Sequence, residues 1–180
     1  MQELKRKTVE EFKAAEKIPI IILLDNVRSM HNVGSIFRTA DAFLLEAIYL
    51  CGFTPRPPHR DIQKTALGAT ETVSWRYFEN AQNAADDLIQ QGFELFAIEQ
   101  VENSKPLYLA SMDLDKKLAV IFGNELTGVG EDLLKRCKGC LEIPQWGMKH
   151  SLNVSVAAGI VIWELTRNKL ITRNKPAQIS

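Results

Sequence analysis

Polar side chains suited to chemistry gather in three segments, each directly after a run of apolar residues. The first segment, residues 25–34, carries four groups suited to polar recognition: Asn26, Arg28, His31 and Asn32. Asn32 is well placed to cap the following helix, and Arg38 falls in the second turn of that helix. An arginine at that position can bind a phosphate or stabilise a developing negative charge on oxygen. A plain helix cap and a plain surface cation are the alternative for these two residues.

The second segment, residues 120–130, holds three glycines within eight residues after an apolar run. This density of glycine predicts a tight backbone path around a ligand. The spacing is not the G-x-G-x-x-G of a dinucleotide site, and the Lys-Ser/Thr pair of a phosphate-binding loop is missing. Glu125, directly after the turn, disfavours a phosphate and suits a cation or a hydroxyl donor.

The third segment, residues 143–158, opens a helix of small apolar residues with Ser151, Leu152 and Asn153. Ser151 and Asn153 are candidates for the pocket, and helix capping is their simpler alternative. Ser151 is a weak candidate for a nucleophile because no G-x-S-x-G elbow surrounds it.

The sequence predicts no metal site. The three histidines lack ligand spacing, since they stand at His31, His59 and His150. Cys137 and Cys140 form a C-x-x-C, but no second pair or histidine set accompanies them. We interpret this pair as small residues near the core, in preference to a redox or metal pair.

Composition and charge favour a single globular domain, since 46 % of the 180 residues are apolar and 24 % are charged. No apolar run reaches the ~18 residues of a membrane span, and the N-terminus does not resemble a signal peptide, so we expect no membrane partner and a cytoplasmic location. The formal net charge is zero, yet basic residues cluster locally. The predicted phosphate contacts are Arg28, His31, Arg56, Arg60, Lys64, Arg167, Lys169 and Arg173. A solvated loop and a solvated tail remain the alternative for the two main clusters.

Apolar patterns predict how these segments are positioned. The expected strands are residues 20–24, 47–51, 73–78, 93–98, 118–122 and 140–143, and the expected helices are residues 2–16, 33–44, 62–67, 80–91, 130–136 and 153–169. Their alternation predicts an α/β fold with a mainly parallel sheet and helices on both faces. The three polar segments follow strands, so they should meet at the carboxyl edge, where such sheets bind ligands.

The three segments resemble, in order, the three motifs of the SpoU (TrmH-like) family of SPOUT RNA methyltransferases. Asn32-Val33-Gly34 with Arg38-Thr39-Ala40 is similar to the first motif, and Phe122-Gly123-Asn124-Glu125 with Gly128 is similar to the second. Ile143-Pro144, Gly147 and Ser151-Leu152-Asn153-Val154-Ser155 are similar to the third. The resemblance runs from about Ile20 to Leu165, nearly the whole chain.

This resemblance implies an enzyme that transfers a methyl group from S-adenosylmethionine to a ribose 2′-hydroxyl of tRNA or rRNA. It also implies a C-terminal trefoil knot that forms the cofactor pocket, and a homodimer with its active site near the subunit interface. Residues 1–180 would be one methyltransferase domain, with 1–17 a peripheral N-terminal helix and 170–180 a basic tail. A catalytically inactive RNA-binding module that keeps the pocket, and an unrelated nucleotide-binding protein, are the alternatives.

The resemblance also implies roles for individual residues. The cofactor pocket would involve Ile98, Glu99, Gly123, Asn124, Ile143, Ser151 and Leu152, and the catalytic set would be Arg38, Asn32, Glu125, Ser151 and Asn153. In the family, the arginine that matches Arg38 is proposed to help remove the hydroxyl proton. Because a guanidinium has a pKa above ~12, we instead expect Arg38 to bind a phosphate and stabilise the alkoxide.

Overall fold

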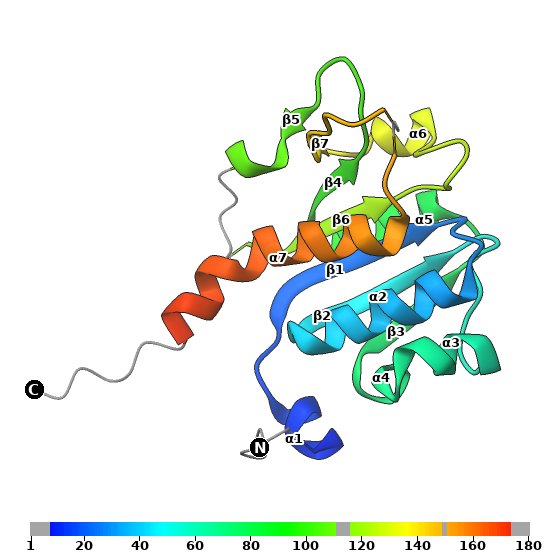
Figure 1. Cartoon of the computed structure of the whole chain (residues 1–180), viewed down its shortest axis with the longest axis vertical. Helices are drawn as coiled ribbons and strands as arrows, with labels where there is room; N and C mark the ends of the chain where they lie inside the picture. The colour runs from blue at the N-terminus through cyan, green and yellow to red at the C-terminus, as the bar shows by residue number, and fades with distance from the viewer. Residues whose placement is uncertain (1–7, 111–115, 149–150, 174–180) are drawn as a thin grey trace, which may run out of the picture.

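The structure of the protein is a computed structural model that describes residues 8–110, 116–148 and 151–173, with residues 168–173 described by their backbone only. Within these residues, seven strands form one sheet in the order β3-β2-β1-β6-β4-β7-β5. Every pairing between neighbouring strands is parallel, and helices cover both faces (Figure 1). The predicted α/β class with a mainly parallel sheet is confirmed.

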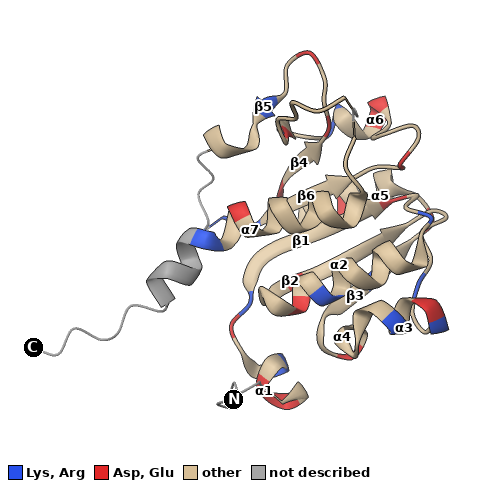
Figure 2. Cartoon of the chain, viewed as in Figure 1, with Lys and Arg blue, Asp and Glu red and all other residues tan. Residues whose placement is uncertain are grey.

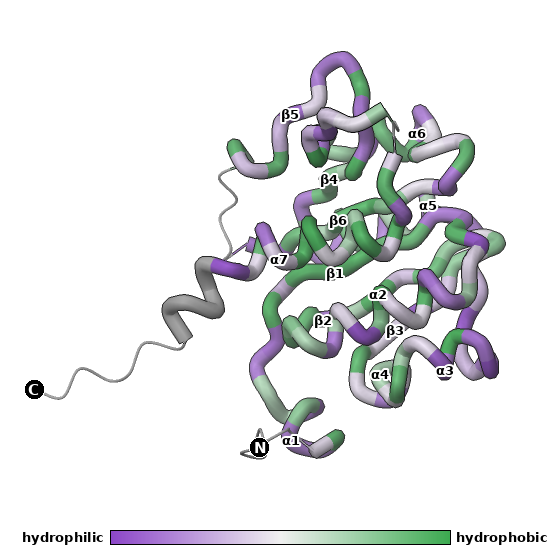
Figure 3. The backbone as a smooth tube through the Cα atoms, in the orientation of Figure 1, coloured by the Kyte–Doolittle hydropathy of each residue, from purple (hydrophilic) through white to green (hydrophobic). Residues whose placement is uncertain are grey.

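The strands are short and mostly apolar. Their bounds are β1 Ile18–Asp25, β2 Leu45–Cys51, β3 Ser74–Phe78, β4 Glu94–Ile98, β5 Lys105–Pro106, β6 Leu118–Phe122 and β7 Gly139–Glu142. β1 and β6 lie in the middle of the sheet and are hydrophobic along their length (Figure 3). Strands buried on both faces need apolar side chains in both directions, which explains their unbroken apolar runs.

The helices separate into two groups, one on each face of the sheet. Their bounds are α1 Val9–Ala14, α2 Met30–Ala42, α3 Arg60–Ala66, α4 Ala69–Thr72, α5 Ala81–Gln90, α6 Glu131–Leu134 and α7 Val154–Arg173, with a 3-10 helix, η1, at Leu107–Leu109. Ile22 and Leu24 of β1 point toward α2 and α7, whereas Ile21 and Leu23 point toward α5. The period-two alternation of β1 therefore divides its side chains between two cores.

Several boundaries differ from those expected. β1 begins at Ile18 and contains Pro19, where the register with β2 shifts between Ile18 and Ile21. The irregularity accommodates a residue that cannot donate to the strand ladder. α7 extends to Arg173, into the predicted tail. The predicted N-terminal helix is described only as α1, and residues 1–7 and 174–180 lie outside the described part of the chain.

Three small elements were not expected from the sequence: α4, β5 and η1. Each is four residues or shorter, so none of them has a readable hydrophobic period. Among the helices that the structure describes, none is both long and apolar enough to cross a bilayer.

Thr54 joins the end of β1 to the loop after β2. It is 3 % exposed, and its Oγ1 donates to the Leu24 carbonyl (3.0 Å) and accepts from the Val27 N–H (3.1 Å). We expect Thr54→Val to lower the free energy of unfolding by about 1–3 kcal/mol, because valine leaves both backbone groups buried without a partner. Urea denaturation measures this change. Thr127→Val, at an exposed residue, is the control, and an equal cost for both variants would contradict the prediction.

Candidate active site

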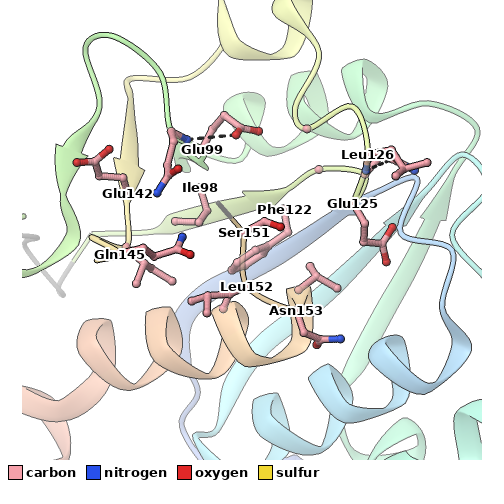
Figure 4. Close-up of a pocket in the computed structure, with 17 residues that line it drawn as sticks. Ile98, Glu99, Phe122, Glu125, Leu126, Glu142, Gln145, Ser151, Leu152 and Asn153 are labelled. Carbon is pink, nitrogen blue, oxygen red and sulfur yellow. Dashed lines mark hydrogen bonds between the residues drawn. The ribbon is translucent and has the colours of Figure 1, made fainter. Parts of the chain in front are cut away.

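A cavity of about 460 Å³ opens at the carboxyl ends of β4, β6 and β7, beside the start of α7. Figure 4 shows Ile98, Phe122 and Leu152 in its middle, with Glu99 and Glu142 on one side and Glu125 and Asn153 on the other. The volume lies within the range of small-molecule sites in proteins. All seven residues that the sequence analysis assigned to a cofactor line this one cavity: Ile98, Glu99, Gly123, Asn124, Ile143, Ser151 and Leu152.

The cavity also has lining residues that sequence reasoning missed. They are Gln100, Phe122, Leu126, Gly128, Glu142, Gln145, Val154 and Ala157. Most of them neighbour a predicted residue in the same segment. Their closeness in sequence to the motifs could therefore have predicted that they line the cavity. Glu142 directly precedes the predicted Ile143, at the end of β7.

Two close backbone approaches shape the glycine-rich segment after β6. A Cβ on Gly123 would lie 2.3 Å from the carbonyl carbon of Gly128 and 2.5 Å from the backbone nitrogen of Val129. Gly128 has a φ of 66°, and its N–H donates to the Asn124 carbonyl at 2.9 Å. The predicted tight backbone path therefore exists and requires glycine at both positions.

Glu99 holds this turn from the neighbouring strand. Its Oε2 accepts the Val129 N–H at 3.0 Å, and a Cβ on Gly128 would lie 2.3 Å from the same oxygen. The carboxylate thereby satisfies a backbone donor at the wall of the cavity.

The expectation that Asn32 caps α2 is wrong. Ser29 is the cap, and its Oγ accepts the Asn32 N–H at 3.3 Å. Because α2 begins at Met30, Asn32 lies inside the first turn and its side-chain amide is available for longer-range contacts. Arg38 accordingly lies in the third turn and not in the second.

Asn32 connects the three predicted segments. Its Oδ1 accepts from Asn153 Nδ2 at 3.1 Å, and its Nδ2 lies 3.5 Å from Glu125 Oε1, at the limit of a hydrogen bond. Asn153 Oδ1 also accepts the Ser155 N–H (2.9 Å). Asn153 therefore caps α7 with its side-chain oxygen while its side-chain nitrogen binds Asn32. Of the predicted catalytic set, Glu125, Ser151 and Asn153 line the cavity, and Asn32 contacts it through Glu125 and Asn153.

Arg38 is the predicted catalytic residue that does not reach this cavity. Its side chain is exposed, and no described residue of the same chain pairs with it. In an ideal helix Arg38 stands about 9 Å further along the axis than Asn32 and about 120° around it. Arg38 therefore lies on a different, exposed side of α2 from Asn32 and does not line the cavity of its own chain.

The outer face of α7 carries an exposed apolar stripe beside α2. Val156, Ile160 and Trp163 are 51, 39 and 53 % exposed and follow the helical spacing i, i+4, i+7. α2 and α7 pack side by side on the same face of the sheet (Figure 1). The stripe and Arg38 therefore belong to one outward surface.

The charges at the cavity are acidic. Glu99, Glu125 and Glu142 line it, and no Lys or Arg does so among the described residues. This environment disfavours a phosphate-bearing ligand and favours a cationic one. It thus argues against the nucleotide-binding alternative.

The predicted phosphate contacts lie mostly near the carboxyl ends of β1 and β2. Figure 2 shows Lys and Arg on the loop after β1, on the loop before α3 and on α3 itself. Arg28 and Arg60 are exposed, Arg56 lies over the Tyr77 ring at 4.2 Å, and Lys64 pairs with Asp61 at 2.6 Å. At the other end of the chain, Arg167 pairs with Glu164 at 2.9 Å, and the side chains of Lys169 and Arg173 lie outside the described residues.

Cys137 and Cys140 pack against the core on the α5 face of the sheet, as predicted. Burial raises the pKa of the Cys137 thiol to about 12, and burial also raises the pKa of Cys140. Both thiols are therefore protonated near neutral pH, which lowers their reactivity.

An all-parallel α/β sheet with an acidic cavity at its carboxyl edge is an arrangement suited to a small cationic ligand. The model of the SpoU rRNA methylase family matches residues 19–163, and the chain belongs to this family. A tRNA (guanosine(18)-2′-O)-methyltransferase of Thermus thermophilus is 32 % identical over 93 % of this chain and 84 % of its own length.

Solved structures show the same fold. The TrmH/SpoU tRNA modifying enzyme of A. aeolicus superposes with a TM-score of 0.80 at 26 % identity, over 92 % of this chain and 82 % of that one. The rRNA methyltransferase of Sinorhizobium meliloti, solved with AdoMet bound, has a TM-score of 0.78 at 27 % identity. That match covers 85 % of this chain and 57 % of the other.

Proposed function

We propose that this chain transfers the methyl group of S-adenosylmethionine to a ribose 2′-hydroxyl of tRNA or rRNA. The convergence of three separated motifs on one acidic cavity, in a chain of the SpoU family, carries the proposal. The relatives named above are 2′-O-methyltransferases or RNA-modifying enzymes, and one of them was solved with this cofactor. The 2′-hydroxyl exists in RNA and not in DNA, so the chemistry requires an RNA substrate.

The residues of the cavity fit this cofactor. Carboxylates at Glu99, Glu125 and Glu142 suit a ligand that carries sulfonium and ammonium charges, and Ile98 and Leu152 offer apolar walls for an aromatic base. The cofactor supplies an already activated methyl group on sulfur. We assign Ile98, Glu99, Gly123, Asn124, Ile143, Ser151 and Leu152 to its binding.

The protein must bring the ribose oxygen into line with that methyl group and take up the hydroxyl proton. The Asn32–Asn153 bond and the approach of Asn32 to Glu125 hold the three motifs in one arrangement. We assign to this group the positioning of the ribose, with Ser151 and Asn153 shaping the floor of the pocket. The guanidinium of Arg38 would bind the substrate phosphate and stabilise the alkoxide that develops as the hydroxyl proton passes to water.

Methyl transfer from labelled S-adenosylmethionine to bulk tRNA and to rRNA tests the proposal directly. A ribose 2′-O-methyl protects the adjacent phosphodiester from alkali, so label should be recovered in alkali-resistant dinucleotides. RNA binding without transfer would instead support the inactive RNA-binding module. Calorimetry with S-adenosylhomocysteine, NAD and ATP completes the test. Tighter binding of NAD or ATP than of S-adenosylhomocysteine would contradict the proposal.

We also propose that two copies pair through the apolar stripe of α7. The stripe stands beside the outer face of α2, so pairing there would bring Arg38 of one copy toward the other copy. Exposed apolar patches of this kind mark association surfaces.

Ile160→Asp is expected to convert the dimer to a monomer, because a carboxylate would be buried in an apolar contact. Sedimentation equilibrium measures the mass, and methyl transfer should fall together with it. Ile89→Asp is the matched control, since Ile89 is 46 % exposed on α5, on the opposite face of the sheet. A dimer that survives Ile160→Asp, or dissociates equally with Ile89→Asp, would place the interface elsewhere.

The remaining expectations stay proposals. They are the trefoil knot, a single domain over residues 1–180, and the RNA contacts of Arg28, His31, Arg56, Arg60, Lys64, Arg167, Lys169 and Arg173. A cytoplasmic location is proposed because tRNA and rRNA are the substrates.

A further inference from the structure

A large aromatic side chain stands in solvent directly after β2. Phe53 is 82 % exposed, although the loop that carries it lies at the same carboxyl edge of the sheet as the candidate site. A scattered exposed apolar residue needs no explanation. Phe53 differs because its backbone is held in place on every side.

The backbone around Phe53 is fixed by hydrogen bonds to the two neighbouring strands, β1 and β3, or to their ends. The Gly52 N–H donates to the Phe78 carbonyl (3.0 Å), and the Tyr77 hydroxyl donates to the Gly52 carbonyl (3.2 Å). The Phe53 N–H donates to Asn26 Oδ1 (3.0 Å), and the buried Thr54 hydroxyl donates to the Leu24 carbonyl (3.0 Å). The phenyl ring is therefore presented outward by a rigid support.

Two unusual backbone conformations make this support possible. Gly52 and Asn26 have φ values of 60° and 56°, and a Cβ on Gly52 would lie 2.3 Å from Asn26 Oδ1. Asn26 is a non-glycine residue in a region that most side chains avoid. Strained conformations of this kind persist where the surrounding structure enforces them and often accompany functional sites.

Asn26 also ties Phe53 to the candidate site. Asn26 accepts the Phe53 N–H through its side chain and accepts from Asn124 Nδ2 (2.8 Å) through its carbonyl. Asn124 lines the cavity. Asn26 thus links the backbone of Phe53 by hydrogen bonds to a residue that lines the cavity.

Cationic side chains lie on the same edge of the sheet as Phe53. Arg28 is exposed next to Val27, whose N–H is bound by Thr54, and Arg56 stacks on Tyr77, whose hydroxyl binds Gly52. The carboxyl of Asp25 is half-buried and accepts from Asn26 Nδ2 (2.7 Å), whereas Glu79, directly after Phe78, is exposed. The two arginines on this edge suit the phosphates of a nucleic acid.

We propose that Phe53 is a stacking platform for an unpaired base of the substrate RNA, next to the nucleotide whose ribose is methylated. An aromatic face flanked by cations is the arrangement by which proteins hold single-stranded bases. The inference rests on the proposed methyltransferase function and adds a residue outside the three motifs. Its role is to bind RNA, so it should act on RNA affinity and not on the cofactor.

Phe53→Ala is expected to weaken the binding of unmethylated bulk tRNA about ten-fold, as the loss of one stacked base does. The loss should be the same at every salt concentration, because stacking releases no counterions. Arg28→Ala, by contrast, should reduce the slope of log affinity against log salt by about one.

Two further variants distinguish stacking from a general apolar contact. Phe53→Trp should restore tRNA affinity, whereas Phe53→Leu should not, because leucine is apolar without an aromatic face. Tyr108→Ala is the matched control, since Tyr108 is an exposed aromatic (63 %) in η1, beyond the opposite edge strand β5.

The outcomes separate this inference from the function on which it rests. A wild-type chain that binds no tRNA and transfers no methyl group would overturn both. If the wild type methylates tRNA but Phe53→Ala or Phe53→Leu binds as tightly as the wild type, only the stacking platform is overturned. A change of salt slope in Phe53→Ala would also overturn it, because the contact would then be electrostatic.

Discussion

Arg38→Ala is expected to lower the single-turnover rate of methyl transfer by about a hundred- to a thousand-fold, the usual cost of losing one donor to a developing oxyanion. Affinity for S-adenosylhomocysteine should stay unchanged, because Arg38 does not line the cavity. Quench-flow with labelled cofactor and calorimetry measure the two quantities on the same preparation. Arg38→Lys should recover only part of the rate, since an ammonium lacks the planar fork of a guanidinium.

The position of Arg38 makes a second result testable. Arg38 lies on the outer face of α2, on the surface that also carries the α7 stripe, so we expect it to act on the pocket of the partner copy. The proposed dimer brings these surfaces together by a two-fold axis. Each active site would then combine the pocket of one chain with the arginine of the other.

Mixing two inactive variants checks this arrangement. Arg38→Ala keeps its pocket, and a second chain with a disrupted pocket, Gly123→Ala, keeps its arginine. Random re-association should restore about a quarter of wild-type activity, because about half of the dimers are mixed and one of their two sites is complete. No recovery in verified mixed dimers would mean that Arg38 serves its own chain. Full activity of Arg38→Ala would remove this residue from the chemistry.

Gly123→Ala is expected to lower cofactor affinity by at least about a hundred-fold. The added Cβ would meet backbone atoms of Gly128 and Val129 at 2.3–2.5 Å, and backbone cannot rotate away as a side chain can. The Val129 N–H is bound by Glu99, and the Gly128 N–H is bound by the Asn124 carbonyl. Because these bonds hold the turn together, the whole turn would have to shift away from the cavity wall. Misplacement of pocket groups on this scale is costly for binding and catalysis.

Gly147→Ala is the matched control for this variant. Gly147 belongs to the third motif, close to Gln145 of the same cavity, yet a Cβ there would meet no atom of the described residues within 4 Å. Isothermal titration with S-adenosylhomocysteine should separate the two variants, and circular dichroism should show that both retain their folds. Wild-type affinity in Gly123→Ala would mean that the cofactor does not occupy this cavity.

Local pattern determined the class of fold and the edge of the sheet where the site lies. The apolar runs that became β1, β4, β6 and β7 predicted parallel strands, and segments that follow such strands must meet at one edge. The seven cofactor residues, which span Ile98 to Leu152, were implied by the resemblance of the motifs to the SpoU family, and all of them line the cavity. Assigning a methyl donor to them depended on the motifs, since no periodicity specifies a ligand.

Tertiary structure alone decided how individual side chains point. The sequence predicted that α2 starts at Val33, whereas it starts at Met30, three residues earlier. Ser29 is therefore the cap in place of Asn32. The side chain of Asn32 is then free to bind Asn153, 121 positions away. The support beneath Phe53 follows in the same way from contacts between distant segments, because Asn26 binds both Phe53 and Asn124. Sequence patterns repeat over a few residues and report which face is apolar, whereas such contacts depend on where every neighbouring element lies.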